Sequence, residues 1–112
     1  MKCIVIDSTK KEVRFEDLTS PTLDCLQKAV GGYIEVAYHP TEDNCIYVNE
    51  EGLINELPDW FSYEGAHQQF AGNGVIAGFD AETGDTSGCT LDLEEVKKNV
   101  KFMSLDELRA SV

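Results

Sequence analysis

Residues 2–17, KCIVIDSTKKEVRFED, carry the clearest evidence for the fold. Two runs rich in apolar and β-branched residues, 2–7 and 12–17, flank a short polar segment that ends in two lysines. This arrangement is typical of two antiparallel strands joined by a turn. The sequence therefore predicts that the chain opens with a β-hairpin, the first unit of an antiparallel sheet.

Two further segments predict strands. Residues 33–38 (YIEVAY) alternate in character, and the apolar run 45–48 (CIYV) follows the polar turn 39–43. This order predicts a second hairpin, to which Leu53 and Ile54 are expected to add a short bridge. Residues 75–79 predict one more strand.

Four segments have helical signals. Ser20 and Pro21 are residues that begin helices, and the apolar positions that follow recur at helical spacing as far as Gly31, which predicts a helix over 20–30. Asp92 begins a capping-box pattern, and Ser104 begins another. Asp59 or Ser62 is expected to cap a helix that runs to Phe70, although Gly65 weakens it.

The chain has 112 residues, of which 42% are hydrophobic and 27% charged, as in ordinary globular proteins. No internal repeat or low-complexity linker divides it. We therefore expect a single compact α+β domain over residues 1–112. It is mostly antiparallel sheet built from hairpins, with a helix in its N-terminal half and a C-terminal helix packed on the sheet. A helical tail covers residues 92–111.

The four cysteines indicate a reduced, intracellular protein. Cys3, Cys25, Cys45 and Cys89 form no C-x-x-C pair, and each lies among apolar residues, where a free thiol behaves as a small hydrophobic side chain. The first strand is too short for a signal peptide, and no apolar run approaches the ~20 residues of a membrane helix. We expect a location in the host cell cytoplasm and no membrane contact.

Acidic residues are concentrated in the middle of the chain. The net charge is −12, and residues 29–96 contain no Lys or Arg. This span holds fourteen acids, namely Glu35, Glu42, Asp43, Glu50, Glu51, Glu56, Asp59, Glu64, Asp80, Glu82, Asp85, Asp92, Glu94 and Glu95. Nucleic-acid binding needs a basic surface, so direct binding is not expected. We expect the acids to gather on one side of the molecule and to meet a basic partner.

The segment around Trp60 combines aromatic and acidic residues. The predicted binding residues are Glu50, Glu51, Glu56, Asp59, Trp60 and Tyr63. In one interpretation, Trp60 and Phe70 are core residues that hold residues 58–70 on the sheet. In the other, Trp60 or Tyr63 is a partly exposed anchor inside an acidic rim.

Known catalytic and ligand motifs are absent from the sequence. The glycines of GNGVIAG lead into a strand, whereas a dinucleotide loop leads from a strand into a helix. Asp80, Glu82 and Asp85 lack the order of an EF-hand, so a solvated loop is expected. His39 and His67 have no triad spacing. We expect no catalytic residue, no metal site and no cofactor.

Several short motifs together resemble a known family. They are V-G-G-Y-I-E at 30–35, I-Y-V-N-E-E-G-L at 46–53, L-P at 57–58 and G-N-G-V-I-A-G at 72–78. Over residues 20–80 the chain resembles a family of small domains of unknown function encoded mainly on bacteriophages, plasmids and other mobile elements. The middle of this chain is more acidic than that pattern, and the tail from Phe102 lies outside it. The resemblance implies no catalytic residues. It implies an accessory factor that binds a host component.

Two functions follow from these observations. The first is a non-enzymatic interaction protein whose acidic surface binds a host protein with a basic surface, as a nucleic-acid mimic or counter-defence factor. The alternative is a protein that binds or sequesters a small ligand or signalling nucleotide, in a homo-oligomer in one version. Its pocket would lie between residues 58–70 and a sheet edge, with Trp60, Tyr63, His67, Gln68 and Gln69. An enzyme that acts on a cationic substrate is a third option, motivated only by the density of carboxylates.

Overall fold

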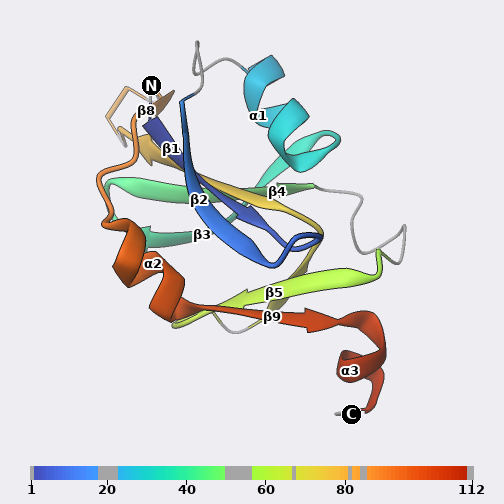
Figure 1. The fold of residues 1–112 in the computed structure, drawn as a ribbon. Coiled ribbons are helices and arrows are strands. Elements are labelled where there is room, and N and C mark those ends of the chain that lie inside the picture. Colours follow the sequence, from blue (N-terminus) through green and yellow to red (C-terminus); the bar gives the residue numbers. More distant parts are fainter. Residues whose placement is uncertain are drawn as a thin grey trace.

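Two antiparallel sheets and three short helices make up the described part of the computed structural model (Figure 1). The structure describes residues 2–17, 23–49, 57–66, 68–80, 82–83 and 86–110. The elements are β1 (Lys2–Asp7), β2 (Glu12–Asp17), α1 (Leu23–Val30), β3 (Ile34–Thr41), β4 (Asn44–Asn49), β5 (Asp59–Tyr63), β6 (Gln69–Ala71), β7 (Gly74–Phe79), β8 (Thr86–Ser87), α2 (Leu93–Asn99), β9 (Val100–Ser104) and α3 (Leu105–Ala110).

The main sheet has the strand order β2-β1-β7-β4-β3, and β8 pairs with β7. The opening hairpin is confirmed: β1 and β2 pair without a register shift from Lys2 opposite Asp17 to Asp7 opposite Glu12. The second hairpin, β3 with β4, is confirmed as well, with register shifts along β3. The predicted strand at 75–79 is β7, which lies at the centre of the sheet between β1 and β4. The predicted bridge at Leu53 and Ile54 lies outside the described residues.

The second sheet has the order β6-β5-β9, and it corrects one prediction. The helix expected from Asp59 or Ser62 to Phe70 is wrong, because the chain forms β5 and β6 there. Aromatic side chains favour the extended conformation, and Phe61 and Tyr63 point to the same face of β5 because strand side chains alternate. Gly65 has a φ of +94°, which turns the chain between the two strands.

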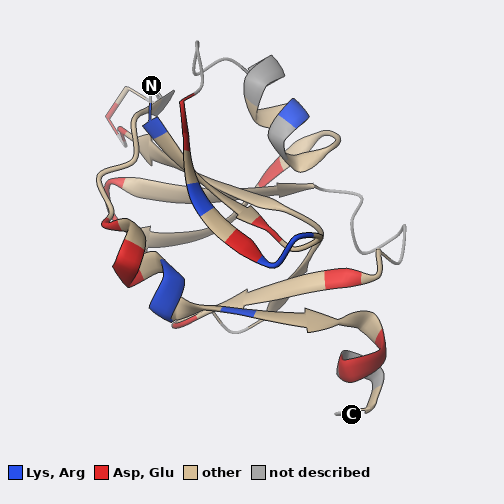
Figure 2. Ribbon diagram, viewed as in Figure 1, with Lys and Arg blue, Asp and Glu red and all other residues tan. Residues whose placement is uncertain are grey.

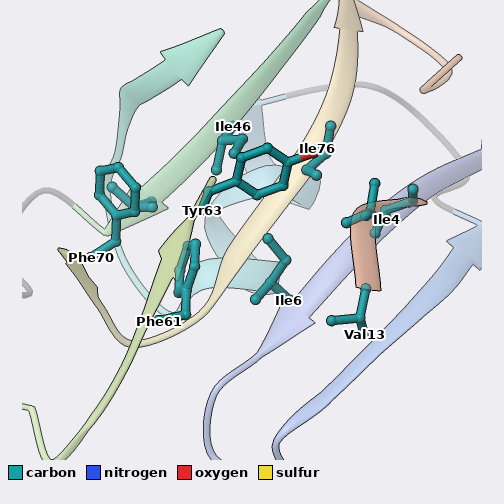
Figure 3. Close-up of a cluster of buried hydrophobic side chains, with 10 residues drawn as sticks. Ile4, Ile6, Val13, Ile46, Phe61, Tyr63, Phe70 and Ile76 are labelled. Carbon is teal, nitrogen blue, oxygen red and sulfur yellow. The ribbon is translucent and has the colours of Figure 1, made fainter. Parts of the chain in front are cut away.

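Two apolar clusters hold the layers together. One lies between the sheets, where Ile4, Ile46 and Ile76 of the main sheet pack with Phe61 and other residues (Figure 3). The other lies on the opposite face of the main sheet and is covered by α1. Adjacent residues of a strand point to opposite faces, so β1, β4 and β7 contribute to both clusters. This explains why their sequences are continuous apolar runs rather than alternating ones.

Helices lie at three of the predicted helix signals within the described residues. Helix α1 ends at Gly31, whose φ is +82° and whose N–H donates to the Gln27 carbonyl, while residues 20–22 lie outside the described part. The Asp92 side chain accepts a hydrogen bond from the Glu95 N–H at the start of α2. The Ser104 hydroxyl accepts one from the Glu107 N–H at the start of α3.

The tail that was predicted to be helical over residues 92–111 contains a strand, β9. The helix that begins after Asp92 ends at Asn99, and Val100 begins β9. β9 then pairs with β5 from Asp59 opposite Ser104 to Tyr63 opposite Val100. The strand that pairs with β9 lies about forty residues earlier in the sequence, so no pattern within residues 100–104 predicts a strand there.

No helix in the described residues is long and apolar enough to cross a membrane. Cys3 and Cys45 are buried in the second cluster, and Cys89 is half-buried beside the first, which confirms the apolar surroundings expected of these three cysteines.

Candidate functional site

The predicted aromatic binding residues are buried. Trp60 is 8% exposed and Tyr63 is 5% exposed, so neither ring is the partly exposed anchor of the second interpretation. The indole N–H of Trp60 donates to the Leu57 carbonyl at 2.6 Å, which satisfies its polar atom inside the protein. Phe70 is 4% exposed. Both rings are therefore buried, as the core interpretation expects, but only Phe70 belongs to the cluster between the sheets, and the binding role of the segment stays a prediction.

Trp60 and Tyr63 also point in different directions. They are three positions apart on β5, so they lie on opposite faces of the second sheet. Tyr63 packs in the cluster between the sheets, where its ring centroid lies 6.1 Å from that of Tyr38. Asp59 is half-buried at the start of the same strand, while Glu50, Glu51 and Glu56 lie outside the described residues. The structure does not bring Trp60 and Tyr63 into one surface.

Acidic residues from three separate segments meet at one end of the main sheet. The Phe79 N–H donates to the Asp43 carbonyl, which joins the β3–β4 turn to the end of β7. Asn44 hydrogen-bonds to Thr90, which brings the approach to α2 to the same end. We call this surface the acidic end and define it by its exposed carboxylates, Glu42, Asp43, Asp80, Glu82 and Asp92.

Other acids of residues 29–96 lie elsewhere (Figure 2). Glu35 is at the opposite end of β3 from the acidic end, because its neighbour Ile34 pairs with Asn49, the last residue of β4. Asp59 and Glu64 belong to the second sheet and the turn that follows β5. Glu94 and Glu95 lie in the first turn of α2. The described acids of the central span are thus divided between the two ends of β3, the second sheet and α2, and they do not all gather on one side as expected.

Besides Lys2, Lys10, Lys11 and Lys28, the described basic side chains are Arg14 and three lysines near the second sheet. Arg14 on β2 forms ion pairs with Asp7 at 3.1 Å and, more loosely, with Glu12 and Glu16. Lys97, Lys98 and Lys101 follow one another at the end of α2 and in β9, and Figure 2 shows this blue segment beside the second sheet. Of these three, only Lys97 has an ion pair with a described carboxylate, that of Glu94 at 3.7 Å.

An open pocket of about 650 Å³ lies beside this basic segment. Its lining residues come from β5 and the turn after it, from β6, and from the junction of α2 and β9. They are Ser62, Tyr63, Glu64, Gly65, Ala66, Gln68, Gln69, Lys98, Asn99, Val100 and Lys101. The volume is within the range of pockets that bind small molecules.

Strand register explains the polar wall of this pocket. Ser62 of β5 pairs with Gln69 of β6 on one side and with Lys101 of β9 on the other. Directly opposite residues in a sheet point to the same face, with Cβ atoms ~5 Å apart. An amide, a hydroxyl and an ammonium group therefore form a row on the face of the second sheet that points away from Phe61 and Tyr63.

Tyr63 and Asn99 join the two halves of the pocket. The Glu64 N–H donates to the Asn99 carbonyl at 2.9 Å, and the Asn99 amide donates to the Tyr63 hydroxyl at 3.4 Å. Burial raises the pKa of Tyr63, against a smaller opposite effect of the Asn99 hydrogen bond. The raised pKa keeps the phenol neutral at physiological pH. The two hydrogen bonds hold the end of α2 against the end of β5.

The sequence model of one protein family matches residues 1–101, and its description is "Domain of unknown function (DUF3846)". The chain belongs to the DUF3846 family. No curated protein and no solved structure matches it. The match extends on both sides of residues 20–80, which carry the resemblance seen in the sequence, and it includes the opening hairpin. It ends within β9, so α3 lies outside it.

This DUF3846 domain places only part of the predicted ligand site in its pocket. Tyr63, Gln68 and Gln69 line the pocket, whereas Trp60 does not, and His67 lies outside the described residues. Ser62 and the residues contributed by the α2–β9 junction were not predicted from the sequence, because their position depends on the pairing of β9 with β5.

No metal centre is evident in the described part of the DUF3846 domain. Among these residues, no group of three or more His, Cys, Asp and Glu side chains is placed to hold an ion. Of the three carboxylates in the loop after β7, Asp85 lies outside the described residues. The Asp80 carboxylate accepts a hydrogen bond from the Glu82 N–H at 2.9 Å, as in an ordinary polar turn.

Proposed function

We propose that this DUF3846 domain is a non-enzymatic accessory protein of a bacteriophage, plasmid or other mobile element, and that its acidic end binds a basic surface of a host protein. The observation that carries this proposal is the convergence of five exposed carboxylates from three chain segments. Among the described residues, no Lys or Arg forms an ion pair with any of them. A basic partner would supply that missing charge and would associate rapidly at low salt.

Mimicry of nucleic acid, as used by a counter-defence factor, is one version of this proposal. DNA presents a charge every ~1.7 Å along its axis, so a mimic needs carboxylates spread along a surface. Glu42 and Asp43 in the β3–β4 turn, Asp80 after β7 and Asp92 before α2 give such a spread across neighbouring segments. The host partner in this version is a protein whose groove normally holds nucleic acid.

Charge reversal tests the proposal. The triple variant Glu42→Lys, Asp43→Lys and Asp80→Lys changes the acidic end, and the matched control Glu35→Lys, Asp106→Lys and Glu107→Lys makes the same change in net charge elsewhere. Each protein is immobilised and exposed to host lysate, and retained proteins are eluted with rising salt. We expect basic or nucleic-acid-binding proteins to be retained by the parent and the control and to be lost from the acidic-end variant.

Retention that is the same for both triple variants would contradict the proposal, because net charge alone would then explain it. Absence of any basic protein from the parent eluate at low salt would contradict it as well.

The second candidate function is binding or sequestration of a small ligand or signalling nucleotide. The pocket favours it, because Tyr63, Gln68 and Gln69 lie together there with the lysines of the C-terminal segment. Those lysines offset the acidity of the chain, which otherwise disfavours an anionic ligand. Thermal-shift screening against nucleotides tests this function, since a ligand at 100-fold its Kd adds ~2.7 kcal/mol of stability. A panel without any shift would exclude it.

A further inference from the structure

We infer that the pocket beside β9 binds a small molecule that carries a phosphate group, and that Lys98 and Lys101 hold the phosphate. This inference rests on the second candidate function and names its ligand class. It comes from three features of the pocket: its charge, its unused hydrogen-bonding groups and the distribution of both across the second sheet.

The pocket is locally basic in a strongly acidic chain. Two lysines and one glutamate line it, although the chain carries 21 acids and 9 bases. Neither Lys98 nor Lys101 forms an ion pair with a described carboxylate. A helix C-terminus favours a nearby cation, and this accounts for Lys98 in the last turn of α2. It does not account for Lys101, which lies inside a strand.

The wall next to Lys101 offers neutral hydrogen-bonding groups. Ser62 lies between Gln69 and Lys101 in the cross-strand row, and among the described residues no side chain or backbone group hydrogen-bonds to the Ser62 hydroxyl or the Gln69 amide. A hydroxyl, an amide NH₂ and an ammonium are all donors, and a phosphate has only acceptor oxygens at neutral pH. The row therefore matches an oxyanion better than it matches a cation or an apolar group.

The single carboxylate of the pocket, that of Glu64, belongs to a residue next to the α2–β9 junction, because the Glu64 N–H donates to the Asn99 carbonyl. Glu64 is exposed in the turn after β5, and a carboxylate accepts hydrogen bonds from hydroxyl or amino groups while it repels a second phosphate. A ligand that carries hydroxyl or amino groups as well as a phosphate therefore offers partners to Glu64 and to the lysines. Nucleoside monophosphates and sugar phosphates have this chemistry.

The experiment uses calorimetric titration of the full chain at low salt with four probes: adenosine monophosphate, ribose 5-phosphate, inorganic phosphate and adenosine. Lys101→Gln and Lys98→Gln remove the two pocket charges while keeping a polar side chain that is one atom shorter. Lys97→Gln is the matched control, because it removes the same charge from the neighbouring exposed residue outside the pocket lining. Circular dichroism melting checks that each variant is folded.

We expect at least one phosphate-bearing probe to bind the parent. Its affinity should fall at least tenfold in Lys101→Gln and change less than twofold in Lys97→Gln. Absence of binding by all phosphate-bearing probes would overturn the inference, as would an equal loss in the control. Adenosine binding that matches adenosine monophosphate and is unchanged by Lys101→Gln would overturn the phosphate assignment while leaving small-ligand binding intact, so the two failures are distinguishable.

Discussion

Asn44 and Thr90, which are 46 positions apart, hold each other through two hydrogen bonds. The Asn44 amide donates to the Thr90 hydroxyl at 2.7 Å, and the Thr90 N–H donates to the Asn44 side-chain oxygen at 3.0 Å. The same amide also donates to the Thr41 hydroxyl at 2.8 Å. Asn44 is 1% exposed, so this side chain is the buried connection between the β3–β4 turn and the segment that leads into α2.

Substitution of Asn44 by Ala should therefore be costly. It removes three hydrogen bonds and leaves the Thr90 N–H without its partner, and loss of a buried partner costs about 1–3 kcal/mol. We expect the free energy of unfolding to fall by about 2 kcal/mol or more in urea denaturation. Glu42→Ala, in the exposed turn nearby, should change it by less than about 0.5 kcal/mol. Similar values for the two variants would show that the Asn44 network does not stabilise the fold.

Gly74 leaves room for the ring of Phe61. A Cβ atom at Gly74 would lie 2.7 Å from the Phe61 Cζ atom, and Phe61 is fully buried against Phe70. Replacement of Gly by Ala in a compatible strand would otherwise be favourable. Because of this clash we expect Gly74→Ala to destabilise the protein by about 1–3 kcal/mol.

A double-mutant cycle isolates this contact. Phe61→Leu removes the distal ring atoms, so the penalty of Gly74→Ala should be smaller in the Phe61→Leu background. Urea denaturation of the four proteins measures the coupling. Additive effects would mean that the ring is not the obstacle.

The Asp7 carboxylate links stability to pH. Burial alone would raise the pKa of Asp7, but the hydrogen bond from the Lys10 N–H and the Arg14 guanidinium together lower it below its ordinary value. A carboxyl whose folded pKa is lowered contributes stability above its unfolded pKa of about 3.9 and loses that contribution as the pH falls through the folded pKa.

We therefore expect Asp7→Asn to be less stable than the parent at pH 7, by about 1–2 kcal/mol. The gap between the two proteins should narrow as the pH falls below about 4. Urea denaturation at a series of pH values measures it. A constant gap would mean that the charge of Asp7 is not what stabilises the hairpin.

The excess of acids should make stability depend on salt. The net charge is −12. Among the described lysines and arginines, only Arg14 and Lys97 form ion pairs with described carboxylates. Salt screens repulsion over a Debye length of ~10 Å at 0.1 M. We expect the Tm to rise between low and moderate NaCl, as measured by circular dichroism. A flat response would indicate that the carboxylates are too far apart to repel one another.

The core thiols should be unreactive in the native protein. Cys45 is fully buried, and burial raises its pKa to about 11, so its reactive thiolate is scarce at neutral pH. Cys3 is fully buried as well. We expect both to be modified by an aromatic disulfide reagent only on unfolding, and Cys89, which is half-buried, to be modified earlier. Peptide mass spectrometry after timed labelling measures the order, and early labelling of Cys45 would contradict the prediction.

The sequence alone determined the features that depend on neighbouring residues. Both hairpins, the glycine end of α1 and the caps at Asp92 and Ser104 follow from residues within a few positions of one another, where turn and capping preferences act. The concentration of acids in the middle of the chain is likewise a property of the sequence. Part of the ligand pocket, at Gln68 and Gln69, was also indicated in this way.

Only the tertiary structure decided the second sheet and what it brings together. Phe61 and Tyr63 lie in a strand because their rings are buried against the main sheet. Residues 100–104 form β9 because their backbone pairs with that of β5. Lys101 reaches Ser62 through that same register. Such contacts form between segments far apart in the chain, so a short stretch of sequence does not reveal the free energy that they contribute. At these positions the burial of side chains, and not the local helix or strand propensity, decides the secondary structure.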